Sequence, residues 1–170
     1  MNIMPIIVNT MNDYSSKNKE MLTYQTSRLQ TLIKEIQHCC DDRKLYETSR
    51  FGLPYSELKC LLLFNGERYL TVKNIAERLE VAKSRVTKLI NDMELKKLAE
   101  KISDPKDSRI KLISLTPLGR KISDELSSFQ NEIHKKILFQ MNEDERKDVI
   151  SMLELLRASM EAVKVQMIES

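Results

Sequence analysis

Apolar side chains recur at the spacing of an amphipathic α-helix over most of this chain. Between residues 14 and 40 neither glycine nor proline interrupts the pattern, and Leu22, Leu29 and Ile36 follow one another at heptad spacing. The same spacing returns in two stretches of the C-terminal third. The pattern therefore predicts long amphipathic helices at both ends of the chain.

Few residues break this pattern, and they mark the ends of helices. The chain has three Gly and four Pro, which excludes a turn-rich β-sandwich, and it contains no glycine-rich nucleotide-binding loop. Gly52-Leu53-Pro54 breaks the pattern, and Pro54 is suited to the first turn of a second helix. We expect that second helix to end at Asn65-Gly66, because both residue types tolerate a left-handed backbone.

The middle of the chain predicts two short helices joined by a tight turn. Thr71 is a candidate N-cap for a helix over residues 72–79. After a connection of residues 80–82, a further helix over residues 83–96 carries basic side chains in its N-terminal half. This order of elements predicts a helix-turn-helix.

A β-hairpin and two more helices complete the predicted fold. Aliphatic runs at residues 98–103 and 110–115 flank a charged, turn-forming segment. Thr116-Pro117 is a candidate N-cap and first residue of the next helix, and Asn142 begins a capping box for the last. The predicted fold class is mainly α with a small β-hairpin wing, a winged helix-turn-helix flanked by long N- and C-terminal helices.

Positive charge is concentrated in the predicted winged helix. The chain carries a net charge of +3, yet the segment from Arg68 to Lys111 alone holds 12 basic and 7 acidic side chains, a net charge of +5. This favours a polyanion such as double-stranded DNA as the partner. A solvated helix face is the alternative explanation for the same charge.

The predicted wing carries a distinctive run of residues. It reads Asp104-Pro105-Lys106-Asp107-Ser108-Arg109 and leads into Leu115-Thr116 and Gly119, after a helix-turn-helix that contains residues 75–79 and 86–90. These segments resemble the MarR family of bacterial transcriptional regulators, whose wing reads D-x-R-D-x-R and continues into L-T-x-x-G. The resemblance implies a cytoplasmic homodimer that binds a pseudo-palindromic DNA operator, most often as a repressor. It also implies a small-molecule effector in the cleft between the winged helix and the dimer helices.

Three positions depart from the family pattern. Lys106 replaces an arginine of the wing, Ala82-Lys83 replaces the Ser-Pro that opens the recognition helix, and Lys97 replaces the glycine that ends it. Because Ala82 has no capping side chain, we expect the first amides of this helix to be free. A non-glycine residue is strained in the left-handed conformation by about 1 kcal/mol, so we expect a different arrangement at Lys97.

A recognition helix reads bases in the major groove with its N-terminal residues. The candidate contacts on this helix are therefore Lys83, Ser84, Arg85, Thr87, Lys88 and Asn91. Arg85 is predicted to contact a base edge, because a guanidinium matches the two acceptors of guanine. Lys88, Asn91 and Lys73 are predicted to contact phosphates. In the wing, the resemblance implies that Arg109, braced by Asp107, reaches the minor groove, with Lys106 near the DNA backbone.

The predicted organisation is a single domain over residues 1–170. Its DNA-binding core comprises residues 53–116, and residues 14–52 and 117–170 form a helical dimerisation region. The resemblance implies that these helices interlock between two subunits. Burial against their own subunit is the alternative, because an apolar stripe does not distinguish the two arrangements.

The sequence predicts no enzyme, cofactor, metal site or membrane segment. His38 and His134 are the only histidines, and neither an H-E-x-x-H nor a C-x-x-C motif is present. Cys39 and Cys40 are candidate thiols of a redox-sensing regulator with the same fold, whereas Cys60 lies in mid-helix among leucines and is a poor candidate. A protein-interaction adaptor that docks through the winged helix is a further alternative.

Overall fold

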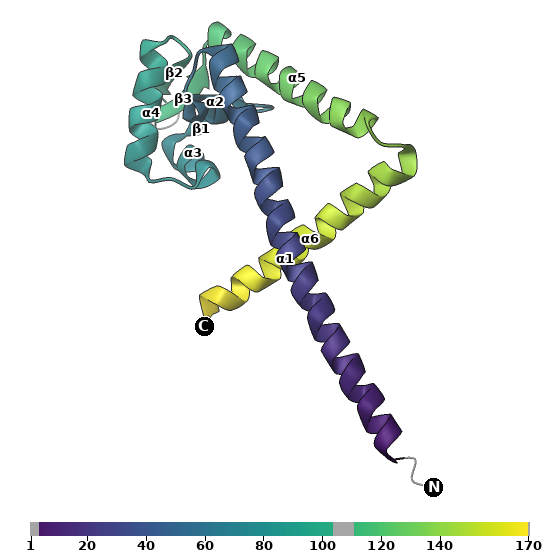
Figure 1. The fold of residues 1–170 in the computed structure, drawn as a ribbon. Coiled ribbons are helices and arrows are strands. Elements are labelled where there is room, and N and C mark those ends of the chain that lie inside the picture. Colours follow the sequence, from purple (N-terminus) through teal and green to yellow (C-terminus); the bar gives the residue numbers. More distant parts are fainter. Residues whose placement is uncertain (1–3, 104–110, 170) are drawn as a thin grey trace. The chain divides into compact units, whose positions relative to one another are not determined.

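Helices make up most of the chain, as the apolar spacing predicts. The structure is a computed structural model that describes the backbone of residues 4–103 and 111–169 and the side chains of residues 18–103 and 111–168. In chain order its elements are α1 (Met4–Phe51), α2 (Tyr55–Leu62), β1 (Leu70–Thr71), α3 (Val72–Leu79), α4 (Lys83–Leu95), β2 (Ala99–Ser103), β3 (Lys111–Leu115), α5 (Pro117–Phe139) and α6 (Glu143–Glu169) (Figure 1). This order confirms the predicted fold class.

The chain divides into two compact units, residues 1–55 and residues 56–170. The first unit consists of α1, which is longer at both ends than the stripe over residues 14–40 indicated. No helix breaker stands between residues 41 and 51, so the helix continues. It ends before Gly52, in the segment predicted to break the pattern. Gly52 has φ of +63°, and its N–H donates to the carbonyl of Thr48 over 3.0 Å.

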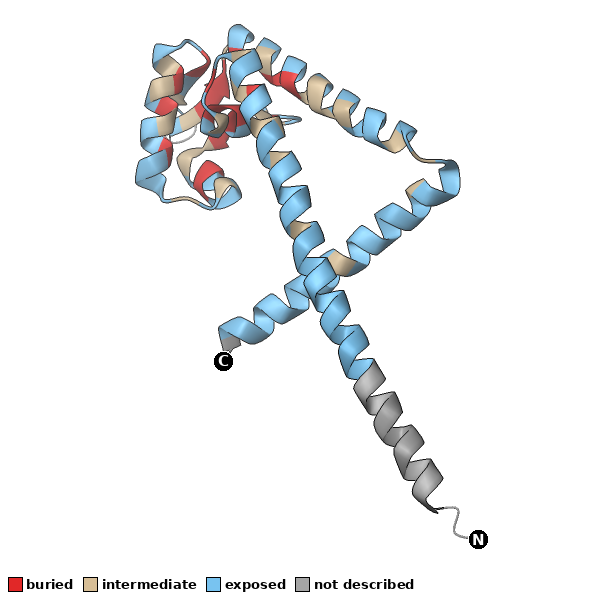
Figure 2. Ribbon diagram, viewed as in Figure 1, coloured by how far each residue is buried: buried red, intermediate tan, exposed pale blue. Residues whose placement is uncertain are grey.

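The winged helix in the second unit is built around one apolar core. Every helix of this part contributes buried residues, coloured red in Figure 2, and α5 adds Gly119, Ser123 and Leu126. The largest of them are Leu58, Leu61, Phe64, Ile75, Val86, Ile90, Met93, Leu98, Ile113 and Leu126. Helical spacing predicts that each of the two short helices turns one apolar face inward, and the residues of both faces are buried or half-buried. They are Val72, Ile75, Ala76 and Leu79 on residues 72–79, and Val86, Leu89, Ile90 and Met93 on residues 83–96.

The wing belongs to a three-stranded antiparallel sheet with the strand order β1-β3-β2. Ala99 of β2 lies opposite Leu115 of β3, which confirms the predicted hairpin. On the other side of β3, Leu70 of β1 lies opposite Ile113. β1 was not predicted, because a strand of two residues is too short to show alternation.

Side-chain caps begin three helices where the sequence predicts them. The Thr71 hydroxyl oxygen accepts the N–H of Asn74 over 3.1 Å, and Asn74 Oδ1 accepts the N–H of Thr71 over 3.3 Å. The Thr116 hydroxyl oxygen accepts the N–H of Gly119 over 3.1 Å at the start of α5. Asn142 Oδ1 accepts two backbone N–H groups over 3.0 Å at the start of α6.

The ends of α2 differ from the prediction. The helix begins at Tyr55, one residue after Pro54, and ends at Leu62 instead of at Asn65-Gly66. The next three N–H groups donate to carbonyls three residues back, so the helix tightens into successive turns. Gly66 then adopts the left-handed conformation expected of it, with φ of +79°.

The recognition helix α4 ends in a left-handed residue that is not glycine. Lys97 has φ of +58°, and its N–H donates to the carbonyl of Glu94 over 2.9 Å. The N–H of Leu98 donates to the carbonyl of Met93, also over 2.9 Å, which completes a Schellman motif. The expectation of a different helix end is therefore wrong. Lys97 adopts the left-handed backbone that glycine usually takes here, and the two hydrogen bonds together with the burial of Leu98 offset its strain.

Replacing Lys97 with glycine is expected to stabilise the protein by about 0.5–1 kcal/mol. The left-handed conformation costs a non-glycine residue about 1–2 kcal/mol, and the greater freedom of glycine in the unfolded chain takes back part of that gain. The free energy of unfolding in urea measures the effect. Lys97→Ala is the matched control, because it removes the same charged side chain and keeps the Cβ. Equal stabilities of the two variants would contradict the strain.

Candidate nucleic-acid interface

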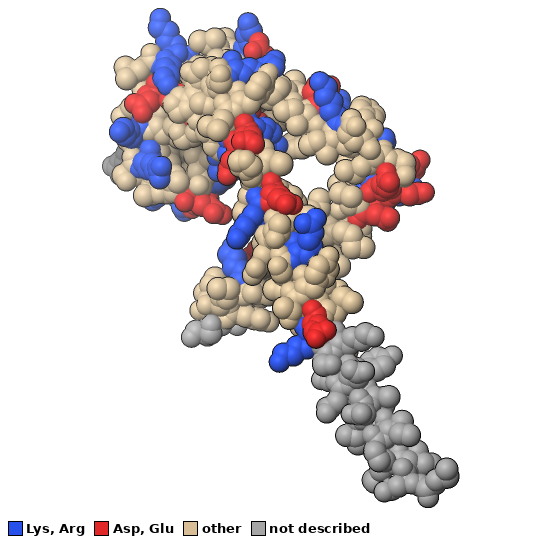
Figure 3. Space-filling view, in the orientation of Figure 1, with Lys and Arg blue, Asp and Glu red and all other residues tan. Residues whose placement is uncertain are grey.

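The predicted base- and phosphate-contacting residues of α4 all lie on its outer side. Val86, Ile90 and Met93 of the same helix are buried. The exposed residues are Lys83, Ser84, Arg85, Thr87, Lys88 and Asn91. Basic side chains, blue in Figure 3, stand out over the winged-helix part of the surface. The inner side of α4 therefore fixes the helix in the fold, while its outer side presents cations to a partner.

The N-terminus of α4 adds backbone donors to these cations. Its N-cap residue, Ala82, makes no side-chain capping bond, as predicted. The Ala82 carbonyl accepts the N–H groups of Arg85 and Val86 over 3.0 and 3.2 Å, which leaves the amides of Lys83 and Ser84 outside the helical ladder. An anion at this end would be stabilised by those amides, by the helix dipole and by the neighbouring cations.

Two of the predicted contacts on α4 also bond within the protein. The Thr87 hydroxyl donates to the carbonyl of Lys83 over 3.0 Å. Asn91 Oδ1 accepts a hydrogen bond from Lys101 Nζ of β2 over 2.6 Å. Among the described residues, by contrast, neither Arg85 nor Lys88 forms an ion pair within 4.0 Å. Lys83 forms no such ion pair among the described residues either, so these three cations of α4 are open to an external anion.

Lys73, the predicted phosphate contact on α3, is exposed and lies 3.8 Å from a carboxylate oxygen of Glu77 on the same helix. A pair this long and this exposed contributes less than about 1 kcal/mol. The ammonium group of Lys73 can therefore exchange that partner for a phosphate at little cost.

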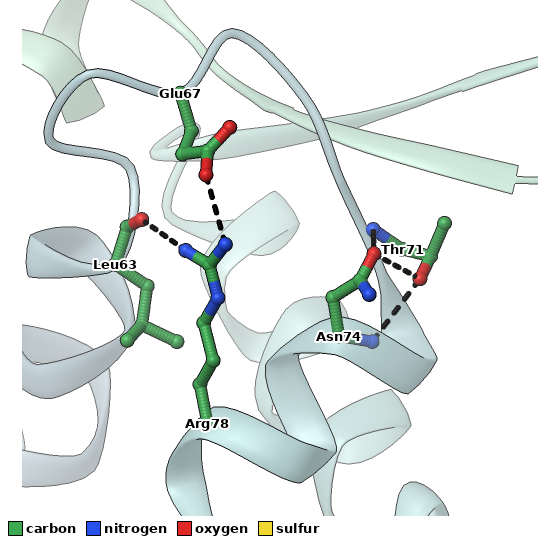
Figure 4. A network of polar contacts seen from close by, with 5 residues as sticks. All are labelled: Leu63, Glu67, Thr71, Asn74 and Arg78. Carbon is green, nitrogen blue, oxygen red and sulfur yellow. Dashed lines mark hydrogen bonds and ion pairs between the residues drawn. The ribbon is translucent and has the colours of Figure 1, made fainter.

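A hydrogen-bond network holds α3 to the loop before it (Figure 4). Arg78 donates to Glu67 Oε1 over 2.8 Å and to the carbonyl of Leu63 over 3.4 Å. At the other end of α3, the reciprocal Thr71–Asn74 cap fixes the first turn. Because α3 leads directly into the turn before α4, these contacts set where the recognition helix begins.

An ion pair between the exposed Lys96 and the buried Glu57 holds the C-terminal end of α4. The side chain of Glu57 on α2 is 4% exposed, and Lys96 Nζ donates to both of its carboxylate oxygens over 2.6 and 2.9 Å.

Burial, with a further contribution from the charge of Glu57, raises the pKa of the Cys60 thiol to about 12. This confirms that Cys60 is a poor candidate for a reactive thiol.

The remaining candidate residues are placed only in part. Lys106, Asp107 and Arg109 lie outside the described residues, so their roles stay predictions. On α1, Cys39 is exposed and Cys40 is half-buried, and a redox role for them also stays a prediction.

A pocket of about 270 Å³ opens beside α4. Its lining combines apolar side chains of the helix-turn-helix with polar and charged side chains of α2 and α4. The lining residues are Ser56, Lys59, Leu79, Val81, Arg85, Lys88, Leu89 and Asp92. The sequence did not indicate this pocket, since it forms between residues that lie far apart along the chain.

Neither a metal cluster nor a membrane span is found in the part of the chain that the structure describes. There, no three His, Cys, Asp or Glu residues are grouped so that they could hold a metal ion. None of the helices in those same ranges is long and apolar enough to cross a bilayer.

Together, a helix-turn-helix with an exposed basic second helix and a β-hairpin directly after it define a winged helix-turn-helix protein. The sequence model of the MarR family matches residues 51–110, which span this core. The resemblance to the MarR family is thereby confirmed over this core of the chain.

Individual relatives extend the similarity beyond the core. The HTH-type transcriptional regulator SarZ of Staphylococcus aureus is 25% identical over 142 residues, which cover 84% of this chain and 88% of SarZ. A mutant of Staphylococcus aureus MepR shares the fold with a TM-score of 0.66 and 25% identity, over 76% of this chain and 96% of that one. FabT of Streptococcus pneumoniae, solved in complex with DNA, reaches a TM-score of 0.70 at 21% identity, over 79% of this chain and 98% of FabT.

Proposed function

We propose that this protein is a sequence-specific, DNA-binding transcriptional regulator. It binds double-stranded DNA as a homodimer on a pseudo-palindromic operator, and it acts as a repressor that a small-molecule effector releases. The observation that carries the proposal is the exposed basic side of α4 within a winged helix that matches the sequence model of the MarR family. The description of SarZ as a transcriptional regulator and the DNA-bound structure of FabT, which has the same fold, support it.

In this proposal the residues of α4 have different roles in DNA recognition. Arg85 contacts a base edge in the major groove, because its planar guanidinium can donate to O6 and N7 of guanine together. Lys88 and Lys73 contact phosphates, as do the open amides at the start of α4. The phosphate contacts set the register and the salt dependence of binding, and the base contact supplies sequence preference.

The homodimer accounts for apolar side chains that the single chain leaves exposed. On α1, Leu22 is 64% exposed and Ile36 is 53% exposed. On α6, Leu153 is 50% exposed and Met160 is 54% exposed. Exposed apolar surface of this extent is typical of an interaction site. A two-fold dimer would also place two recognition helices on two half-sites of one operator.

The pocket beside α4 gives the effector a place to act. Any small molecule bound there would touch Arg85 and Lys88, the side chains on which DNA binding depends in this proposal. Occupancy would therefore favour a state with lower affinity for the operator. The cleft between the winged helix and the long helices, where the resemblance places an effector, stays a second candidate site.

Binding of random duplex DNA at two salt concentrations tests the central proposal. We expect affinity to fall steeply as salt rises, because phosphate contacts release counterions. No detectable binding at low salt would overturn the proposal and favour the adaptor alternative. Selection of bound sequences from genomic DNA then tests specificity, and recovery of an inverted repeat would support the dimer.

Arg85→Ala and Lys88→Ala are expected to affect DNA binding differently. Arg85→Ala should cost about 1–3 kcal/mol on the preferred operator and relax preference at particular base pairs. Lys88→Ala should weaken all sequences alike and lower the salt slope by about one. Affinities across an operator library, measured at several salt concentrations, separate the two effects. Each variant serves as the control for the other, and identical profiles would contradict this division.

A further inference from the structure

Lys101 of β2 connects the wing sheet to the recognition helix. Its ammonium group lies 2.6 Å from Asn91 Oδ1 and 2.5 Å from Glu94 Oε2, and both partners belong to α4. The other carboxylate oxygen of Glu94 accepts the backbone N–H of Lys101 over 3.2 Å. The Glu94 carboxylate thus accepts hydrogen bonds from both the backbone N–H and the ammonium group of Lys101. These two contacts keep the ammonium group next to Asn91.

The chemistry of this contact fixes the orientation of the Asn91 amide. A lysine ammonium group only donates hydrogen bonds, whereas an asparagine side chain has one accepting oxygen and one donating nitrogen. The oxygen of Asn91 must therefore face Lys101, and its NH₂ group is turned away from the ammonium. Asn91 is exposed on the same side of α4 as Arg85 and Lys88.

We propose that Lys101 is a positioning residue for DNA binding, which orients Asn91 so that its side-chain NH₂ donates to a DNA phosphate. Phosphate oxygens only accept hydrogen bonds, so an amide turned the other way would present the wrong group. Lys101 itself stays paired with Glu94 and contributes no net charge toward the DNA. This inference rests on the proposed function, because it requires that α4 faces DNA.

A double-mutant cycle of Lys101→Met and Asn91→Ala tests the proposal. Lys101→Met keeps most of the aliphatic side chain and removes every donor. The probe is random-sequence duplex DNA, because a phosphate contact does not depend on base sequence. Lys121→Met is the matched control, since it removes one exposed lysine on α5 that lies 3.9 Å from its own carboxylate partner, Glu125.

We expect each single variant to lower the affinity about tenfold, as for a lost hydrogen bond to a charged group. The double variant should bind about tenfold more tightly than the product of the two single losses, because both remove one contact. Any separate effect of leaving Glu94 unpaired is common to two arms of the cycle and cancels. The control Lys121→Met should stay close to the wild type.

Two results would overturn the proposal while leaving the proposed function intact. One is strictly multiplicative losses in the cycle, which would mean that Lys101 and Asn91 act independently. The other is a fall in the salt slope of about 0.9 for Lys101→Met, which would identify Lys101 as a phosphate contact itself. Absence of salt-dependent binding by the wild type would instead overturn the proposed function. Thermal melting of each variant checks that the fold is retained, and Lys101→Arg, which keeps the charge and the donors, should restore the coupling.

Discussion

Replacing Gly119 with alanine is expected to destabilise the protein by about 3 kcal/mol, at the upper end of what overpacking costs. A Cβ on this residue would lie 1.9 Å from the carbonyl oxygen of Leu98 and 2.9 Å from its carbonyl carbon. Both are backbone atoms, so no side-chain rotation relieves the overlap, and the start of α5 would have to move away. The better helix propensity of alanine, worth about 1 kcal/mol, offsets only part of this cost.

Urea unfolding measures this loss directly, and for a chain of this length it corresponds to a melting temperature lower by roughly 6–12 °C. Gly66→Ala is the matched control. Gly66 has φ of +79°, but a Cβ there would meet no atom within 4 Å. That variant should therefore show only the strain of the left-handed backbone, about 1–2 kcal/mol. If Gly119→Ala proved no less stable than Gly66→Ala, the close approach of α5 to Leu98 would be refuted.

The same junction gives a physical reason for the L-T-x-x-G pattern that follows the wing. The Thr116 hydroxyl donates to the carbonyl of Lys97 over 2.6 Å, and the Thr116 N–H donates to the carbonyl of Leu98 over 3.1 Å. The hydroxyl oxygen also caps α5 by accepting the N–H of Gly119. Thr116 thus connects the start of α5 to the residues that follow α4. Gly119, which has no Cβ, allows the backbone of α5 to approach the backbone of Leu98 closely.

Features that depend on neighbouring residues could be predicted from the sequence. The caps at Thr71, Thr116 and Asn142 each need only a side chain that reaches an amide two or three residues away. The buried faces of α3 and α4 follow from helical spacing alone. Gly52 and Gly66 adopt left-handed backbones, as glycine does at the ends of helices.

Features that depend on distant residues could not be predicted. The Glu57–Lys96 pair joins residues 39 positions apart. The sequence does not show which opposite charge such a residue will pair with. β1 exists only because β3 lies beside it. Glu80, with φ of +55°, takes a left-handed backbone in the turn of the helix-turn-helix although its type does not favour it. There the surrounding packing overrides local preference.

The candidate interface shows the same division. Helical spacing was enough to place Arg85 and Lys88 on the outer side of α4, and both are exposed. Spacing could not show that the Asn91 oxygen is engaged by Lys101, because that contact joins a helix to a strand. The sequence thus indicates which side of α4 faces a partner, and the fold determines which polar groups on that side are free to bind it.

The exposed apolar surface of α6 bears on the proposed homodimer. Its stripe of Val149, Met152, Leu153, Met160, Val163 and Met167 is exposed along its length. Leu156, which shares this face by helical spacing, is half-buried. Full burial of one such apolar side chain would contribute about 1.5–3 kcal/mol. This surface is therefore the strongest argument for the proposed homodimer.

The double variant Leu153→Glu, Met160→Glu is expected to make the protein a monomer and to lower its affinity for a full operator about 100-fold or more. The two residues lie seven apart on the exposed stripe of α6, so the new carboxylates would be buried without partners at a dimer interface. A monomer loses the second half-site, and linking two half-sites raises affinity by about 10²–10⁴. Light scattering after size-exclusion chromatography measures the mass, and titration with operator DNA measures the affinity.

Ser151→Glu with Ala158→Glu is the matched control for this prediction. It introduces the same two charges at the same spacing on the other side of α6, at residues that are also exposed. This variant should remain a dimer and bind the operator nearly as the wild type does. Because the winged helix and its core are untouched in both variants, both should keep weak binding to a single half-site. If the Leu153, Met160 variant stayed dimeric, the stripe of α6 would not be the subunit interface, and its apolar side chains would need another partner.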